Sequence, residues 1–254
     1  MTDTLLLTLL IFVAALLYSS VGHAGASGYL AAMALFNLAP AEMRPTALVL
    51  NLVVATIGTI QFSRAGCFSW RIFWPFSVFS VPCAFLGGFW KLPDGVYKII
   101  LGLVLFFAAW RLAFAQSSNA APETKPLPLS QAMLFGVPIG FLSGLVGVGG
   151  GIFLSPVLLL FRWADTRTTA GVSVVFILVN SAAGLLGTLC AGKSISVLPK
   201  IVWWIPAVLL GGFIGSRLGS RHLAPIIMRR LLALVLLLAG ADQIWRGVKI
   251  LKGG

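Results

Sequence analysis

Long runs of apolar residues follow one another along the chain. Each is close to the roughly 20 residues that a helix needs to cross a hydrocarbon core of about 30 Å. Plain apolar runs predict membrane-spanning helices at about 45–63, 70–90, 95–114, 168–190, 199–218 and 226–248. They leave no room between them for a sizeable aqueous domain. The pattern therefore predicts an all-α integral membrane protein.

Two further apolar segments, 5–38 and 129–161, are too long for a single crossing. As continuous helices at 1.5 Å per residue, each would extend for roughly 50 Å. Glycine-rich sequences interrupt both, GHAGASG at 22–28 and GVGGG at 147–151. We expect Gly22–Gly28 and Gly147–Gly151 to be non-helical near the middle of the bilayer, so that each segment forms a helical hairpin broken at its glycines.

The two halves of the chain repeat one another. Residues 17–36 align without a gap on 142–161, which pairs Gly22 with Gly147 and Gly25 with Gly150. The match then continues with a one-residue shift, which pairs Val49 with Val175. We expect a first membrane repeat over 1–115, a polar, proline-rich linker over 116–128 and a second repeat over 129–254. If each broken hairpin enters and leaves on the same side, three crossings remain in each half. An odd number makes the second half start on the opposite side of the membrane, so the halves are predicted to be inverted repeats.

Composition agrees with a lipid environment, since 59% of the residues are apolar, 9% are charged and the mean hydropathy is +1.02. The net charge of +12 would suggest nucleic acid in a soluble chain. Here the basic residues stand mostly at helix ends, where we interpret them as headgroup anchors facing the lipid bilayer, and no nucleic-acid partner is expected. No Lys or Arg precedes Arg44, so the first helix lacks a signal peptide's basic start and is expected to be retained.

A broken helix exposes backbone N–H groups that have no partner within the helix. The start of a helix also carries the positive end of its dipole, so such a break can hold an anion. The sequence GVGGG would present the amides from about Gly149 to Phe153. The alternative is that the glycines only let helices pack closely, as the spacing of Gly140 and Gly144 allows. That alternative does not explain why the breaks recur at matching places.

Duplicated halves, the pattern from Gly147 to Pro156 and the sequence AGCFSWR at 65–71 resemble the TauE/SafE family of membrane transporters, the sulfite-exporter and toluenesulfonate-uptake family. The resemblance implies transport of a small sulfur-containing or organic anion, such as sulfite, sulfoacetate or a sulfonate, across the cell membrane, here the inner membrane of a bacterium. The first half departs from the pattern, because His23 and Ala24 stand where the second half has Val148 and Gly149.

Polar residues in apolar helices tend to face a cavity or another helix. Asn51 and Asn180 lead the substrate-contact candidates, although hydrogen bonding between helices would explain them equally well. His23 could carry charge or a proton as an imidazolium, or line a polar cavity as a neutral ring. His222 is expected at an interface. The candidate substrate-binding residues are Gly22, His23, Gly25, Ser27, Asn51, Gly147, Gly149, Gly150, Gly151, Ser173 and Asn180.

Energy coupling is constrained by what the sequence lacks. No nucleotide-binding loop motif occurs, and of the six acidic residues only Asp242 falls in a predicted span, four residues before Arg246, which suggests an ion pair. No cofactor, metal or enzymatic activity is expected. Secondary transport is favoured, either without a coupling ion or with a proton on His23, and a passive anion channel is the alternative. A homodimer is left open.

Overall fold

The computed structural model describes residues 2–113, 124–192, 198–221 and 226–253. Regular secondary structure in these ranges is entirely α-helical. The helices are α1 (Thr2–Ser19), α2 (Ala26–Leu35), α3 (Pro40–Arg64), α4 (Trp70–Phe89), α5 (Asp94–Ala113), α6 (Leu129–Val146), α7 (Gly151–Leu160), α8 (Thr166–Cys190), α9 (Leu198–Arg221) and α10 (Ile226–Gly253). His222 and much of the expected linker lie outside the described residues.

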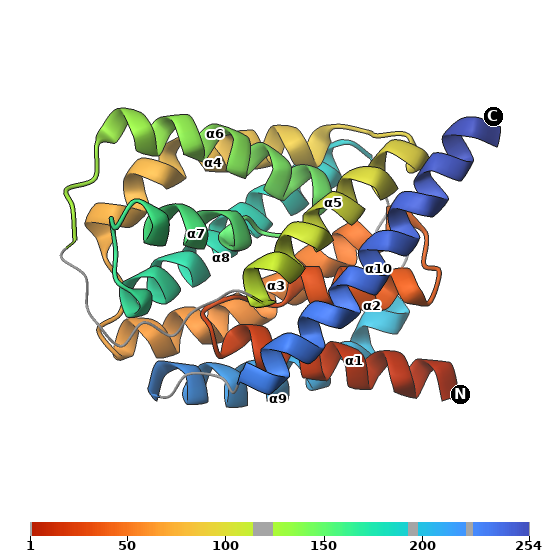
Figure 1. The fold of residues 1–254 in the computed structure, drawn as a ribbon, viewed down its shortest axis with the longest axis horizontal. Helices are drawn as coiled ribbons and strands as arrows, with labels where there is room; N and C mark the ends of the chain where they lie inside the picture. The colour runs from red at the N-terminus through yellow and green to blue at the C-terminus, as the bar shows by residue number, and fades with distance from the viewer. Residues whose placement is uncertain (1, 114–123, 193–197, 222–225, 254) are drawn as a thin grey trace.

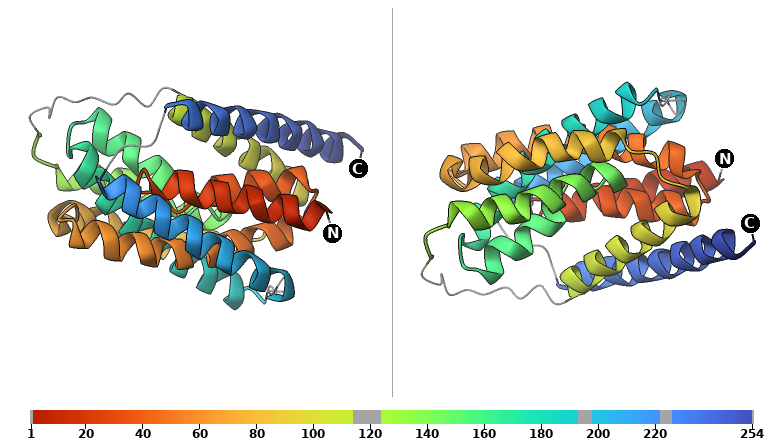
Figure 2. Two further views of the ribbon diagram at one scale, coloured as in Figure 1. Left: turned by 90° about the horizontal axis from the view of Figure 1, so that it is seen from below. Right: turned by 90° about the horizontal axis from the view of Figure 1, so that it is seen from above.

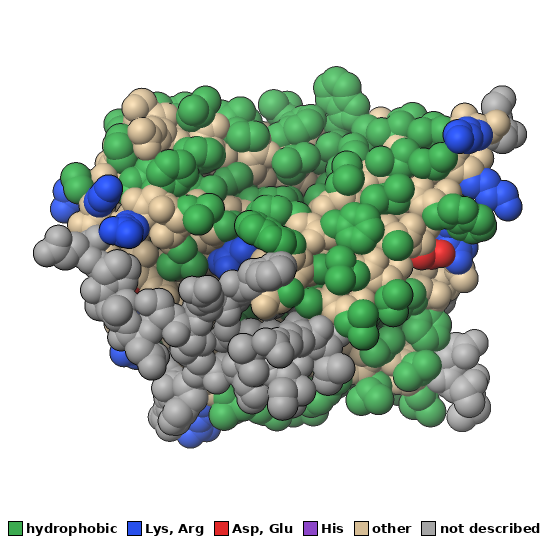
Figure 3. All heavy atoms as spheres, in the orientation of Figure 1, with side chains coloured by type: hydrophobic (Ala, Val, Ile, Leu, Met, Phe, Trp, Pro, Cys, Tyr) green, Lys and Arg blue, Asp and Glu red, His purple; other side chains and the backbone are tan. Residues whose placement is uncertain are grey.

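The lengths of the helices and the apolar side chains on the surface are those of a membrane protein. Within the described residues, five helices are long and apolar enough to cross a bilayer, namely those at Pro40–Arg64, Trp70–Phe89, Leu129–Val146, Thr166–Cys190 and Ile201–Gly219. Figure 3 shows apolar side chains over most of the visible face, with Lys and Arg mainly toward the two ends. Leu134 and Trp203 are 70% and 72% exposed, which is favourable in lipid. The prediction of an all-α, multi-pass membrane protein is confirmed.

Local sequence explains where the two longest central helices begin and end. Pro40 occupies the first turn of α3, where its missing N–H costs nothing. The side chain of Asp165 caps α8 by accepting a hydrogen bond from the amide of Thr168 at 2.8 Å. Each helix ends before a left-handed glycine, Gly66 (φ 70°) or Gly192 (φ 69°), which stops it cleanly.

The two long apolar segments are broken, as the sequence predicts, but the breaks are shorter than expected. The first covers residues 20–25 and the second residues 147–150. Ala26, Ser27 and Gly28 lie within α2, and Gly151 is the first residue of α7, so the expectation that they are non-helical is wrong. The reason is that the first turn of a helix already has helical backbone angles although its N–H groups are unpaired.

Figure 1 shows the course of both broken segments. The first helix, α1, runs inward from the N-terminus at the right, and α2 turns back toward that side. In the other half, α6 runs inward from the left, and α7 turns back to the left before α8 begins. Both breaks therefore lie inside the bundle rather than at its ends.

Helices of one half pack mainly on helices of the other. The pairs with the most extensive contact are α1 with α9, α4 with α6, α4 with α8, α3 with α8, α3 with α9, and α5 with α10. Exchanging the first five helices with the last five turns this set of pairs into itself. Figure 2 shows α5 and α10 crossing each other along one side of the bundle. The core of the molecule is therefore shared between the two halves.

Candidate functional site

The second break exposes a run of backbone amides. The amides of Gly147 and Val148 both turn back to the carbonyl oxygen of Ser143, at 2.9 and 3.2 Å, and so finish α6. Beyond them Gly149 (φ 81°) and Gly150 (φ 83°) adopt left-handed angles that side chains disfavour. Within the described part of the chain, the four amides from Gly149 to Ile152 donate no hydrogen bond. Phe153, the last of the amides expected to be free, is bonded to the carbonyl oxygen of Gly150 at 3.0 Å.

The first break has the same construction without the glycine triplet. The amide of His23 donates to the carbonyl oxygen of Tyr18 at 2.9 Å, and Gly25 (φ 107°) begins α2 as its N-cap. The next hydrogen bond runs from the amide of Tyr29 to the carbonyl oxygen of Gly25 at 2.9 Å. Between these points, and as far as the described residues extend, the amides from Ala24 to Gly28 have no acceptor. Each half thus contributes a helix start with free donors.

The two breaks touch each other through His23. Its Nε2 atom lies 3.2 Å from the carbonyl oxygen of Gly151 and 3.1 Å from the hydroxyl of Ser155, both at the start of α7. Ser155 in turn lies 2.8 Å from the hydroxyl of Ser173 on α8. The structure therefore brings together His23, Gly151 and Ser173, three of the residues proposed from sequence. Ser155 is a fourth member that sequence reasoning missed, although it is a polar residue in an apolar helix, as Ser173 is.

Asn51 holds the second break in place. Its side-chain amide nitrogen lies 3.3 Å from the carbonyl oxygen of Val148 and 3.2 Å from the hydroxyl of Ser181. A Cβ atom at Gly149 would come within 2.7 Å of that nitrogen, so only glycine fits there. The carboxamide oxygen of Asn51 is buried and has no hydrogen-bond partner among the described residues. This oxygen repels an anion, so any anion would meet the backbone amides instead.

Asn180 is placed differently from Asn51, although both were candidates. Its amide nitrogen donates to the carbonyl oxygen of Phe176 at 2.9 Å, one turn earlier on the same helix. The side chain is fully buried. Within the described residues it makes no hydrogen bond to either break. Asn180 therefore forms no part of the hydrogen-bond network of the candidate site.

The remaining candidates shape the breaks rather than line them with side chains. Ser27 donates its hydroxyl proton to the Tyr18 hydroxyl at 2.7 Å, which ties α2 to α1. A Cβ atom at Gly22 would lie 2.5 Å from Cα of Ala170, so this glycine permits close contact with α8. In the same way Gly147 lies against Arg44, and Gly150 lies against the ring of Phe176.

Arg44 is a buried cation whose structural role the sequence did not reveal. It is 4% exposed, and its guanidinium donates to the carbonyl oxygens of Gly87 (2.7 Å), Gly88 and Trp90 (3.2 Å) at the end of α4. These carbonyls lie at the negative end of the helix dipole, which a cation stabilises. In the sequence, Arg44 comes just before a predicted span, which favours a lipid headgroup anchor. Its burial shows that this interpretation is wrong for Arg44.

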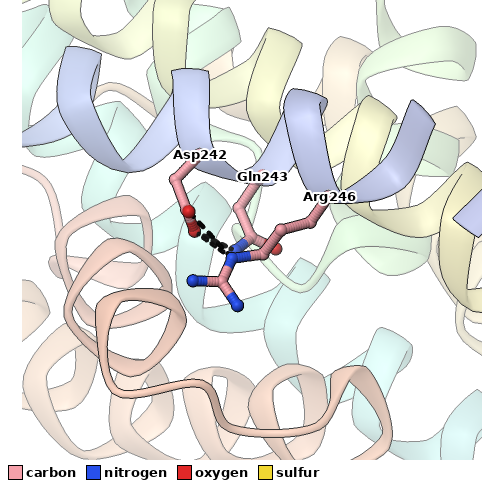
Figure 4. Close-up of polar contacts among 3 residues, drawn as sticks. All are labelled: Asp242, Gln243 and Arg246. Carbon is pink, nitrogen blue, oxygen red and sulfur yellow. Dashed lines mark hydrogen bonds and ion pairs between the residues drawn. The ribbon is translucent and has the colours of Figure 1, made fainter. Parts of the chain in front are cut away.

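Asp242, the carboxylate in the last span, forms an ion pair with a residue of the same helix. Asp242 and Arg246 form the expected ion pair one turn apart on α10, with 2.7 Å between Oδ2 and Nε. Figure 4 shows both side chains together with Gln243, whose amide nitrogen lies 3.3 Å from Asp242 Oδ2. The prediction that this carboxylate is paired is confirmed.

A family model described as sulfite exporter TauE/SafE matches residues 7–242. The chain belongs to the TauE/SafE family. The match contains both breaks and all ten helices at least in part, so the family relationship covers the whole candidate site. It confirms the resemblance seen in the glycine pattern.

Curated TauE/SafE relatives carry transporter names. A probable membrane transporter protein of Sinorhizobium fredii is 43% identical over 248 residues, which is 96% of this chain and 99% of the relative. The probable membrane transporter protein YunE of Bacillus subtilis is 24% identical over 61% of this chain and 59% of its own. The sulfite exporter TauE/SafE family protein 5 of Arabidopsis thaliana is 27% identical over 56% of this chain and 31% of its own length. No solved structure matches the chain. The protein is therefore a multi-pass membrane protein of a transporter family.

Proposed function

We propose that this TauE/SafE protein is a secondary transporter that exports a small sulfur-containing or organic anion, such as sulfite, sulfoacetate or a sulfonate. The family description and the name of the Arabidopsis relative both refer to sulfite export. The anion would bind near the middle of the bilayer at the two helix breaks. No catalytic step, cofactor or nucleic-acid partner enters the proposal, and a homodimer stays a prediction.

The observation that carries the proposal is the pair of amide runs, Ala24–Gly28 and Gly149–Ile152. Each run stands at a helix start, where unpaired N–H groups and the positive end of the helix dipole point the same way. Contact between His23 and Gly151 places the two starts next to each other. In the low dielectric of a membrane interior, such donors attract an anion far more strongly than they would in water. A full negative charge could therefore be held without a bound metal ion.

Inverted repeats would give this site a transport mechanism. Figure 1 supports them, because α1 and α6 run inward from opposite ends of the bundle. Residue contacts support them too. Gly58 lies against Val174 while Gly184 lies against Leu48, and the alignment pairs these four positions with one another. We propose repeats at 1–115 and 129–254, joined by the linker at 116–128. Exchange between two equivalent arrangements could open the site to either side in turn.

A flux panel in proteoliposomes tests the function. Sulfite, sulfate, thiosulfate, methanesulfonate, sulfoacetate and small carboxylates would be offered one at a time, with empty liposomes as the control. A carrier predicts saturable flux and counter-transport for at least one of the sulfur-containing anions. Single-channel currents would show an anion channel instead. Flux of carboxylates alone would contradict the proposed substrate class.

A further inference from the structure

Both ring nitrogens of His23 face carbonyl oxygens. Nδ1 lies 3.1 Å from the carbonyl oxygen of Val21, and Nε2 lies 3.2 Å from that of Gly151. A carbonyl oxygen can only accept a hydrogen bond, so each contact requires an N–H group on the ring. Neutral imidazole has one N–H group and can serve only one of the two carbonyls. Imidazolium has two and can serve both.

Ser155 allows the same pocket to hold the neutral ring as well. Its hydroxyl lies 3.1 Å from Nε2 of His23, 2.9 Å from the carbonyl oxygen of Gly151 and 2.8 Å from the hydroxyl of Ser173. When Nε2 carries no proton, the Ser155 hydroxyl can donate to it. When Nε2 carries a proton, the hydroxyl can turn and donate to Gly151 or Ser173. Rotation of one hydroxyl therefore accommodates both protonation states.

The charges around His23 favour a proton only together with an anion. Arg111 on α5 is a cation whose field reaches His23, and Tyr18 on α1 meets the imidazole edge-on with 6.4 Å between ring centroids. From α7 and α8 the ring is approached by hydroxyl groups, those of Ser155 and Ser173. Among the described side chains, no carboxylate forms a hydrogen bond with His23. A protonated His23 near Arg111 would therefore need a negative charge from a bound ligand.

We infer that His23 couples anion binding to proton binding, so that the transporter carries its anion together with one proton. The inference rests on the proposed function, because it places the anion at the breaks that His23 joins. The proton is taken from water on one side onto the imidazole and returned to water on the other side when the anion leaves. By linkage, a proton that improves anion binding is itself held more tightly when the anion is bound. The two halves meet at this residue, so both breaks sense its charge.

Calorimetry on the purified full-length protein tests the coupling. Thiosulfate and methanesulfonate are the probes, because their own charge is constant near neutral pH. Each is titrated at one pH in two buffers with different enthalpies of ionisation, which reports the number of protons taken up per anion. Coupling predicts uptake of up to about one proton, and an affinity that falls up to tenfold for each unit of rising pH. Anion binding with no proton uptake would overturn the inference and leave the proposed function standing, whereas no binding by any anion of the flux panel would overturn both.

Variants assign the proton to His23. His23→Gln keeps a hydrogen-bonding side chain that cannot take up a proton, so we expect anion binding without proton uptake and without the pH dependence. Ser216→Ala is the control, because this buried serine donates its hydroxyl proton to its own helix at Gly212 (2.6 Å) and, among the described residues, to neither break. It should behave like the wild type. Proton uptake that persists in His23→Gln would show that another group carries the proton. The two-buffer result on the wild type decides the coupling even if the variant does not fold.

Discussion

Gly149 of the second break lies directly against Asn51 of the first half. A Cβ atom at position 149 would come within 2.7 Å of the Asn51 amide nitrogen and 2.8 Å of the Ser181 hydroxyl. The break therefore keeps its shape only where the chain has no side chain and where Asn51 holds the carbonyl oxygen of Val148. Both sides of this contact can be tested.

Gly149→Ala should abolish transport. The left-handed backbone alone costs about 1–2 kcal/mol with a Cβ atom, and the collision with Asn51 adds about 1–3 kcal/mol or displaces the break. Gly66→Ala is the matched control, since Gly66 is also left-handed (φ 70°) but has open space around its Cβ position. Proteoliposome flux should be lost in the first variant and kept in the second.

Asn51→Ala should reduce transport much more than Asn180→Ala. The first change leaves the Val148 carbonyl oxygen without its donor and frees the break, at a cost of about 1–3 kcal/mol. The second removes a bond within α8 only. Flux normalised to the amount of protein in the liposomes makes the comparison. Equal losses would mean that Asn180 has a role at the site that its contacts do not reveal.

Features that depend on local sequence could be predicted. Span length and the glycines located both breaks, because hydrophobic thickness and left-handed backbone are properties of short stretches of chain. The start of α2 at Ala26 was misplaced, since a first turn is hard to distinguish from a loop by composition. Ser155 was missed and Asn180 was overvalued for another reason. The contacts of Ser155 depend on how α7 lies against His23 and α8, which no single stretch of sequence encodes. Asn180 instead bonds to its own helix, an alternative that composition does not distinguish from a contact with the site.

Asp165→Ala should destabilise the protein by about 1 kcal/mol at neutral pH through loss of the α8 cap. Partial burial raises the pKa of this carboxyl, but hydrogen bonds from the backbone and hydroxyl of Thr168 outweigh burial, and the net pKa is lowered. A lowered pKa in the folded state means that the stabilisation is present above the unfolded-state pKa of about 3.9 and is lost as the pH falls below it. The difference in melting temperature should therefore be largest near pH 7 and become smaller toward about pH 3, where Asp165 is left with an uncharged cap. Asp165→Asn keeps an uncharged cap, so a loss as large as that of alanine would contradict this explanation.

Arg44→Met should destabilise the protein by about 3 kcal/mol, because the carbonyl oxygens of Gly87, Gly88 and Trp90 would lose their common donor inside the bundle. Removing a buried cation is itself favourable, so two effects compete. Loss of the hydrogen bonds should dominate, since Met cannot donate, although the Gly88 carbonyl oxygen keeps the Thr188 hydroxyl as a donor at 3.4 Å. The stability of Arg44→Lys should lie between that of the wild type and that of Arg44→Met. An ammonium group keeps the charge but cannot donate to several carbonyls in the planar geometry of a guanidinium.

The control for Arg44 is Arg64→Met, at the exposed end of the same helix, which should change stability by less than about 0.5 kcal/mol. Thermal unfolding in detergent, monitored as the loss of monodisperse protein, ranks the variants by stability. Arg44 also lies against Gly147 of the second break. In Arg44→Lys, we therefore expect the transport rate to be reduced more strongly than the thermal stability. A stable Arg44→Met protein with normal flux would show that the end of α4 needs no cation and that the second break is held by Asn51 alone.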